Sequence, residues 1–77
     1  MTLAYEELID FILTGHPPED VIEFRPSETA RQRVSDLIHR EKTSGLSPEE
    51  VSELNTYMQL EHIMRLAKAK AWQLRGP

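Results

Sequence analysis

The sequence predicts a small all-α protein of three helices. Apolar residues recur at steps of three and four along three segments, and glycine and proline separate these segments. The one short stretch that could be extended has no second strand to pair with. We therefore expect helices at about residues 2–14, 27–43 and 47–75, within a single domain of residues 1–77.

The first helix has clear start and stop signals. Thr2 is a suitable N-cap residue, and Glu6 and Glu7 lie near the positive end of the helix dipole. Gly15, followed by two prolines, ends the helix. Its apolar surface is wider than one neighbouring helix can cover, which favours burial from two sides. The residues that form this surface are Tyr5, Leu8, Ile9, Phe11, Ile12 and Leu13.

The connection at residues 16–26 is expected to be irregular. Residues 18–20 could open a single helical turn, and residues 21–24 then read as an extended segment. In that conformation Ile22 and Phe24 lie on the same side, so we expect both to anchor the connection into the core.

The second helix is expected to begin near Ser27 and to be ended by Thr43, Ser44 and Gly45. Glu28 lies in its first turn, and its apolar residues form one stripe. Gly45 is the natural left-handed residue after the helix, and only Leu46 separates it from the next cap. Because this turn is short, the second and third helices should form an antiparallel hairpin. The stripe consists of Ala30, Val34, Leu37 and Ile38.

The third helix has the strongest start signal in the chain. Ser47 and Glu50 form a capping box, in which each side chain accepts a hydrogen bond from the other's backbone N–H, and Pro48 occupies the first helical position. No glycine or proline then follows until Gly76. A helix of roughly 28 residues is about 42 Å long, which is too long for a core this small to cover. Part of it should therefore bind something else.

Surplus apolar surface predicts a protein interface. Along the third helix an apolar seam follows heptad spacing, and its second half narrows to alanines that would let another helix approach closely. The seam could pair with a second copy of the chain or with a different protein, and both alternatives stay open. The predicted interface residues are Leu8, Phe11, Ile12, Tyr57, Leu60, Met64, Ala67, Ala71 and Leu74.

Size and composition also favour association. A chain of 77 residues buries only about 60% of its unfolded surface. There is no cysteine, so disulfides and thiolate metal sites are excluded, and a homodimer or a protein partner is the expected supplement. The N-terminus lacks a basic segment, and no apolar run is long enough for a membrane span, so we expect a soluble, cytoplasmic protein.

The residues that could carry chemistry do not combine into a catalytic or metal site. His16 lies beside two prolines with no obvious orienting carboxylate, and His39 lies in the exposed last turns of the second helix. His62 points about 100° away from Glu61 on the same helix, so the two cannot share a ligand. We therefore expect no enzyme activity, no cofactor and no metal.

The basic end of the third helix indicates nucleic acid as an alternative partner. The chain has a net charge of −4, yet no acidic residue follows Glu61, so the end of the third helix is positive. With an aromatic side chain among the cations, it could make salt-sensitive contacts with nucleic-acid phosphates. The same residues also suit the negative end of any helix dipole. The candidate contact residues are Arg65, Lys68, Lys70, Trp72 and Arg75.

Four stretches of the chain carry a family resemblance: Phe24–Ser27, Arg33–Ile38, Leu46–Glu50 and Leu60–Ala71. Together they resemble a family of small, largely uncharacterised bacterial proteins that is well represented in cyanobacteria. Membership would imply an all-helical cytoplasmic protein with no established activity. Some relatives look like antitoxins encoded beside nuclease-like proteins, which implies a nuclease-like toxin as a possible partner. No toxin contact and no catalytic residue carries over from the resemblance.

The predicted function is a non-catalytic protein-interaction module. Its sharpest form is an antitoxin-like protein that binds a partner protein. The alternatives are a purely structural homodimer and a small nucleic-acid-binding regulator that uses the basic helix end.

Overall fold

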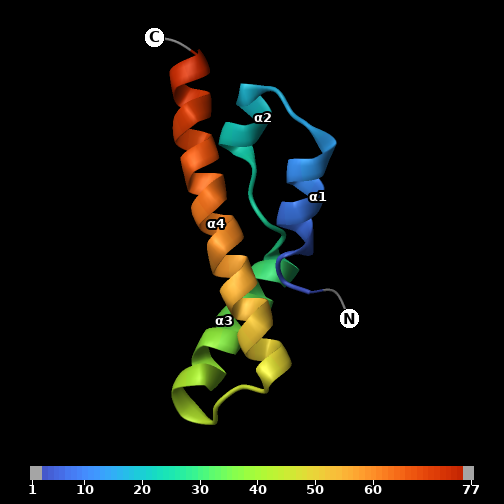
Figure 1. The fold of residues 1–77 in the computed structure, drawn as a ribbon, viewed down its shortest axis with the longest axis vertical. Coiled ribbons are helices and arrows are strands. Elements are labelled where there is room, and N and C mark those ends of the chain that lie inside the picture. The colour runs from blue at the N-terminus through green and yellow to red at the C-terminus, as the bar shows by residue number, and fades with distance from the viewer. Residues whose placement is uncertain (1–2, 76–77) are drawn as a thin grey trace.

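A computed structural model describes residues 3–75, and these residues form four helices and no strand (Figure 1). The helices are α1 (Glu6–Thr14), α2 (Pro18–Glu23), α3 (Glu28–Thr43) and α4 (Pro48–Arg75). The predicted all-α class and the long C-terminal helix are confirmed. The molecule is elongated, 47 × 22 × 19 Å, because α4 extends along most of its length.

The expectation of three helices was wrong by one, because part of the connection at 16–26 is helical. Pro18 occupies the first position of α2, where a missing N–H costs nothing, and Glu19 and Asp20 follow in the first turn. Helical rather than extended backbone changes which side chains face inward. Val21 and Phe24 pack against the core, in place of the expected pair of Ile22 and Phe24.

The first helix begins later than expected. Tyr5 occupies the N-cap position of α1, without a capping hydrogen bond from its side chain, and the helix begins at Glu6. The predicted cap, Thr2, lies outside the described residues. The predicted stop is confirmed, because α1 ends at Thr14 and Gly15 adopts a positive φ of 69°.

The hairpin of α3 and α4 has the predicted caps. Ser27 accepts a hydrogen bond from Ala30 N (3.1 Å), and Gly45 has a φ of 89°. At the start of α4, Ser47 N donates to Glu50 Oε1 (3.0 Å) and Glu50 N donates to Ser47 Oγ (3.2 Å), which confirms the capping box. The two helices run in opposite directions and meet at the short turn between them (Figure 1).

The core lies where α1 and α3 pack on the first two thirds of α4. α2 packs further along α4, toward its C-terminal end (Figure 1). Within residues 3–75, no helix combines the length and the apolar character that a membrane crossing requires. The clustered buried residues are Ala4, Leu8, Val34, Leu37, Leu54, Tyr57 and Met64.

Candidate functional site

The predicted interface residues divide into a buried and an accessible group. Leu8, Tyr57, Met64 and Ala71 are at most 5% exposed, so the chain's own fold uses them and they offer almost no surface to a partner. Ile12 and Leu74 are exposed. The other three, Phe11, Leu60 and Ala67, are partly buried.

Two packings cause this division: Leu8, Tyr57 and Met64 belong to the core formed with α1 and α3, and α2, which was expected to be an irregular connection, covers α4 further along. α2 packs against α4 near its C-terminal end, where the alanines were expected to receive a partner helix. Ala67 lines a hollow of about 180 Å³ together with Val21 of α2 and with Phe11 and Ile12 of α1. The small side chains therefore let the chain's own helix approach α4 closely.

A stripe of apolar side chains is nevertheless left on the outside of α4. Ile63, Leu66 and Leu74 are 49%, 59% and 66% exposed, and Ile12 of α1 lies beside this side of α4 at the hollow that contains Ala67. Ile63, Ala67 and Leu74 follow one another at steps of four and seven, so they lie on one side of the helix. We call Ile12, Ile63, Leu66, Ala67 and Leu74 the outer stripe; Ala67 is partly buried beside α2 and forms its inner edge.

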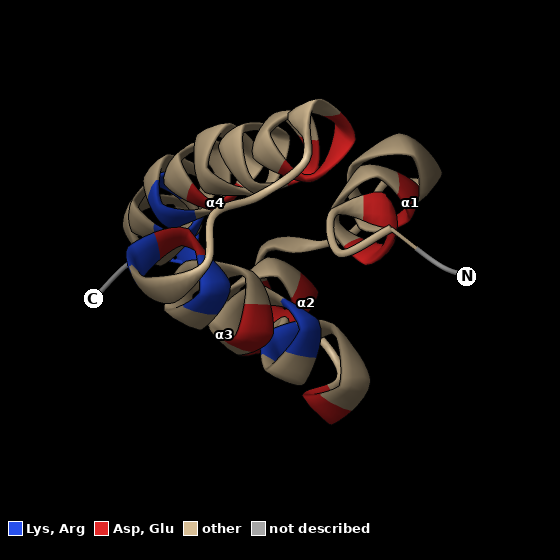
Figure 2. Cartoon of the chain, turned by 90° about the horizontal axis from the view of Figure 1, so that it is seen from below, with Lys and Arg blue, Asp and Glu red and all other residues tan. Residues whose placement is uncertain are grey.

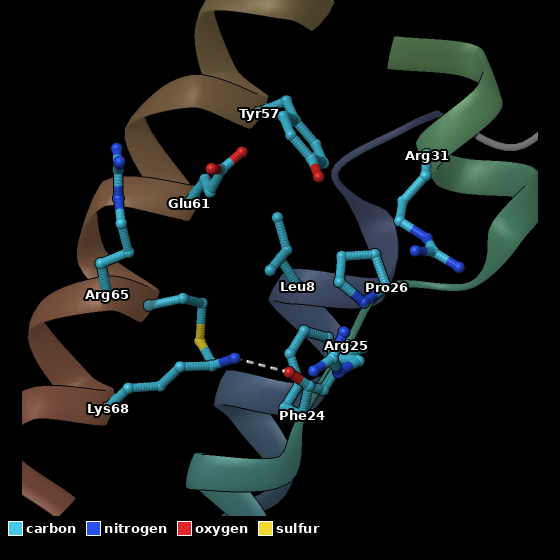
Figure 3. Close-up of a pocket in the computed structure, with 10 residues that line it drawn as sticks. Leu8, Phe24, Arg25, Pro26, Arg31, Tyr57, Glu61, Arg65 and Lys68 are labelled. Atoms are coloured by element: carbon cyan, nitrogen blue, oxygen red, sulfur yellow. Dashed lines mark hydrogen bonds between the residues drawn. The ribbon is translucent and has the colours of Figure 1, made fainter. Parts of the chain in front are cut away.

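A groove opens on a different side of α4 (Figure 3). It has a volume of about 410 Å³ and lies between α4 and the segment that leads from α2 into α3. Its walls combine apolar and cationic groups, with one carboxylate. The apolar members are Leu8, Phe24, Pro26, Tyr57 and Met64, and the charged members are Arg25, Arg31, Glu61, Arg65 and Lys68.

Two contacts fix the width of this groove. Lys68 Nζ donates a hydrogen bond to the backbone oxygen of Phe24 (2.7 Å), which ties α4 to the opposite wall (Figure 3). The ring centres of Phe24 and Phe11 lie 4.3 Å apart, and the ring of Phe11 stacks on that of His16 with 3.9 Å between the ring centres. The wall opposite α4 is therefore held both by a hydrogen bond and by aromatic packing.

Five of the six arginines of this chain fall into two electrostatic groups. Arg33 and Arg40 are bound to carboxylates of α3 and α4, which raises the pKa of both guanidinium groups through hydrogen bonds to Glu53 and Glu50 respectively. In contrast, Arg25, Arg31 and Arg65 in the groove form no ion pair with any residue between 3 and 75. These three cations are available to a ligand.

The predicted nucleic-acid residues do not gather in one patch. Arg65 and Lys68 line the groove, whereas Lys70 lies about 200° further around the helix than Lys68. The guanidinium carbon of Arg75 lies 5.3 Å from the ring centre of Trp72, and Trp72 is 56% exposed. Basic residues mark the C-terminal part of α4, and acidic residues mark α1 and the start of α4 (Figure 2).

Glu53 is a buried charge that the sequence analysis did not single out. It is 4% exposed and accepts hydrogen bonds from Ala4 N (2.9 Å), Arg33 Nε (3.1 Å) and Arg33 Nη2 (2.9 Å). The hydrogen bonds from Arg33 lower the pKa of this carboxyl most strongly. Its position four residues before Tyr57, on the apolar seam, was the available signal. The contacts give Glu53 a structural role, because it joins α4 to α3 and to the N-terminal segment.

One histidine has a partner that was not expected. Asp20, brought close by α2, lies 3.7 Å from His16 Nδ1, and Thr14 Oγ1 lies 2.7 Å from His16 Nε2. Positions 16 and 20 have the i, i+4 spacing, so the expectation that His16 lacks a nearby carboxylate was wrong. In the part of the chain that the structure describes, three or more His, Cys, Asp or Glu side chains do not come together around a possible metal position.

Comparisons with protein-family models, with curated proteins and with solved structures gave no match. The two surfaces of α4, the outer stripe and the groove, are therefore the features from which a function can be inferred.

Proposed function

We propose that this chain is a non-catalytic protein-interaction module that pairs with a second copy of itself through the outer stripe. The observation that carries the proposal is the exposure of Ile63, Leu66 and Leu74 on one side of α4, with the exposed Ile12 of α1 at the hollow that Ala67 lines. Burying such side chains against a partner is favourable by about 1.5–3 kcal/mol each.

The stripe carries little charge, and this favours a second copy over a different partner. Lys70 is the charged residue that lies among these apolar side chains, between Ala67 and Leu74. Homodimer interfaces are more apolar than the interfaces of transient complexes, which carry more polar and charged groups. Pairing would also stabilise the fold, because a chain of 77 residues with no cysteine has only a small core and no disulfide to stabilise it.

The spacing of the stripe fits helix-on-helix pairing. Ile63, Ala67, Lys70 and Leu74 alternate at steps of four and three, which is the pattern of core positions in a coiled coil. In a two-fold symmetric dimer the same stripe is presented by both copies. A lysine at one core position sets the register of such a pair at some cost in stability.

Sedimentation equilibrium tests the proposal. The wild-type chain should form a dimer at micromolar concentration, and Leu66→Glu and Leu74→Glu should each shift it to monomer, because two carboxylates would be buried per dimer. Met58→Glu is the matched control. Met58 is 41% exposed on α4 but lies about 180° around the helix from Ala67, so this variant should stay dimeric. A wild-type chain that is monomeric throughout would contradict the proposal.

The alternative of a nucleic-acid-binding regulator has weaker support, because Lys68 and Lys70 point to different sides of α4. It predicts binding to generic duplex DNA that falls steeply with salt and is lost in Lys68→Glu with Lys70→Glu. Absence of binding at low salt would exclude it.

A further inference from the structure

The geometry points to a second binding site, independent of the outer stripe: the groove between α4 and residues 24–26 binds an acidic, amphipathic polypeptide segment of another protein. The occupant is defined by an apolar floor and cationic walls on an otherwise acidic molecule.

The groove carries positive charge. Arg25, Arg31, Arg65 and Lys68 line the groove against the single carboxylate of Glu61, so the site is positive although the whole chain carries −4. The other two arginines of α3 are paired with carboxylates, Arg33 with Glu53 and Arg40 with Glu50. Leaving three arginines without ion pairs around one concave site favours a ligand that brings negative charge.

The floor of the groove is apolar. Leu8 and Met64 are almost fully buried at the bottom of the groove, and Phe24 and Pro26 form its far wall. A volume of about 410 Å³ lies within the range of small-ligand sites and admits a few side chains. Apolar side chains repeated along one face of a helix are the usual occupants of such a groove. A phosphate-rich ligand would leave this floor uncovered, which disfavours nucleic acid.

The groove also contains a hydrogen-bond donor, the hydroxyl of Tyr57. This hydroxyl points into the groove (Figure 3), and the side-chain hydrogen bonds among residues 3–75 do not include it. Burial raises the pKa of this hydroxyl, so it stays protonated at neutral pH. It can therefore donate to a carboxylate or a backbone carbonyl of the bound segment.

Lys68 acts differently from the arginines. Its Nζ already donates to the backbone oxygen of Phe24, so it fixes the distance between the walls. We assign it a positioning role, whereas Arg25, Arg31 and Arg65 supply charge to the ligand.

The test uses a labelled peptide of about 14 residues that carries leucines at the i, i+3, i+4 and i+7 positions and glutamates elsewhere. Fluorescence anisotropy should show saturable binding at about 0.15 M salt. A scrambled peptide of the same composition, with its leucines no longer on one face, should bind about tenfold more weakly or worse. A single-stranded oligonucleotide should not displace the acidic peptide.

Variants of the folded chain locate the site. The double change Arg31→Glu with Arg65→Glu should weaken peptide binding at least about tenfold, and Tyr57→Phe should weaken it several-fold without loss of helicity. Lys42→Glu, an exposed cation at the end of α3, is the matched control and should bind like the wild type. Circular dichroism checks that each variant is folded.

Three results of the peptide titrations would overturn the assignment. These are no binding of the amphipathic peptide, equal binding of the scrambled peptide, and equal loss in Lys42→Glu, since the last two would indicate unspecific charge attraction. Displacement by the oligonucleotide would also overturn it in favour of nucleic acid. Repeating the titration with Leu66→Glu separates this inference from the dimer, because the groove does not include the outer stripe.

Discussion

At the scale of single residues, Glu53 contributes most clearly to holding the elements together. Replacing it by Gln removes the charge that pairs with Arg33 and one of the accepting oxygens. Hydrogen bonds to charged groups contribute about 1.5–3 kcal/mol, so we expect Glu53→Gln to lower the free energy of unfolding by about 2 kcal/mol. Urea unfolding followed by circular dichroism measures this change.

Glu49→Gln is the control for Glu53→Gln. Glu49 is exposed in the first turn of α4, where its interaction with the helix dipole contributes about 0.3–1 kcal/mol. If both variants lose the same amount of stability, the contacts of Glu53 have no special role.

The lowered pKa values of three carboxyl groups predict how the free energy of unfolding depends on pH. The hydrogen bond from Arg40 lowers the pKa of Glu50 to about 2, and hydrogen bonds from Arg33 and Ser27 lower the pKa of Glu53 and Glu7 respectively. In the unfolded chain these groups titrate near their ordinary value of about 4.3. Because the folded pKa values are lower, the stabilisation is fully present above that value and is lost as pH falls toward 2.

Urea unfolding at a series of pH values checks this dependence. The contribution of these three groups to the free energy of unfolding should stay constant from about pH 6 down to about pH 5. It should then decrease steadily as the pH falls further. Glu50→Gln should flatten the decrease. Stability that rises on acidification below pH 4 would contradict the assignment of these ion pairs.

At the scale of elements, the capping box of α4 is the first device to test. Ser47→Ala removes the acceptor for Glu50 N and should cost roughly 1 kcal/mol of unfolding free energy. Ser52→Ala provides the comparison, because Ser52 is exposed inside α4, where alanine is the better helix former. Thermal unfolding of both variants should therefore shift in opposite directions.

A second element-scale prediction concerns the cation on the outer stripe. If α4 pairs with a copy of itself, Lys70→Leu adds apolar surface at a core position and should tighten the dimer about tenfold or more. Lys42→Leu, on the exposed end of α3, should leave the dissociation constant unchanged. Sedimentation equilibrium across a concentration series distinguishes these outcomes.

How far the sequence predicts the elements depends on how local their signals are. The ends of α3 and α4 are determined by residues within one turn, so the cap Ser47, the C-terminal Gly45 and a helix start near Ser27 were identified correctly. α2 has only six residues, too few for a periodic pattern, and the spacing of Ile22 and Phe24 was compatible with extended backbone.

The candidate surfaces were predicted less well, for the same reason. Without α2, the side of α4 that contains Met64 and Ala71 had no visible cover, so these residues were assigned to a partner. The groove could not be foreseen either, because its walls come from residues that are more than thirty positions apart, such as Arg25 and Arg65. Heptad spacing identified the correct helix but not which of its sides remains free.

At the scale of the whole molecule, α4 separates two surfaces with different chemistry. One side presents the outer stripe, with Lys70 among apolar residues, and another presents the cationic groove. The elongated shape, 47 Å in its longest dimension, leaves both surfaces accessible at once. A dimer formed through the stripes would therefore present two grooves to acidic partner segments.

Pairing of two copies through the outer stripe can be tested by paramagnetic relaxation between copies. Because the chain has no cysteine, Gln73→Cys places a single spin label beside the stripe. The labelled chain is mixed with unlabelled, ¹⁵N-enriched chain. We predict broadening between copies at the amides of residues 63–74 and at Ile12. No broadening between copies, or broadening confined to residues 24–26 in the groove, would contradict the account.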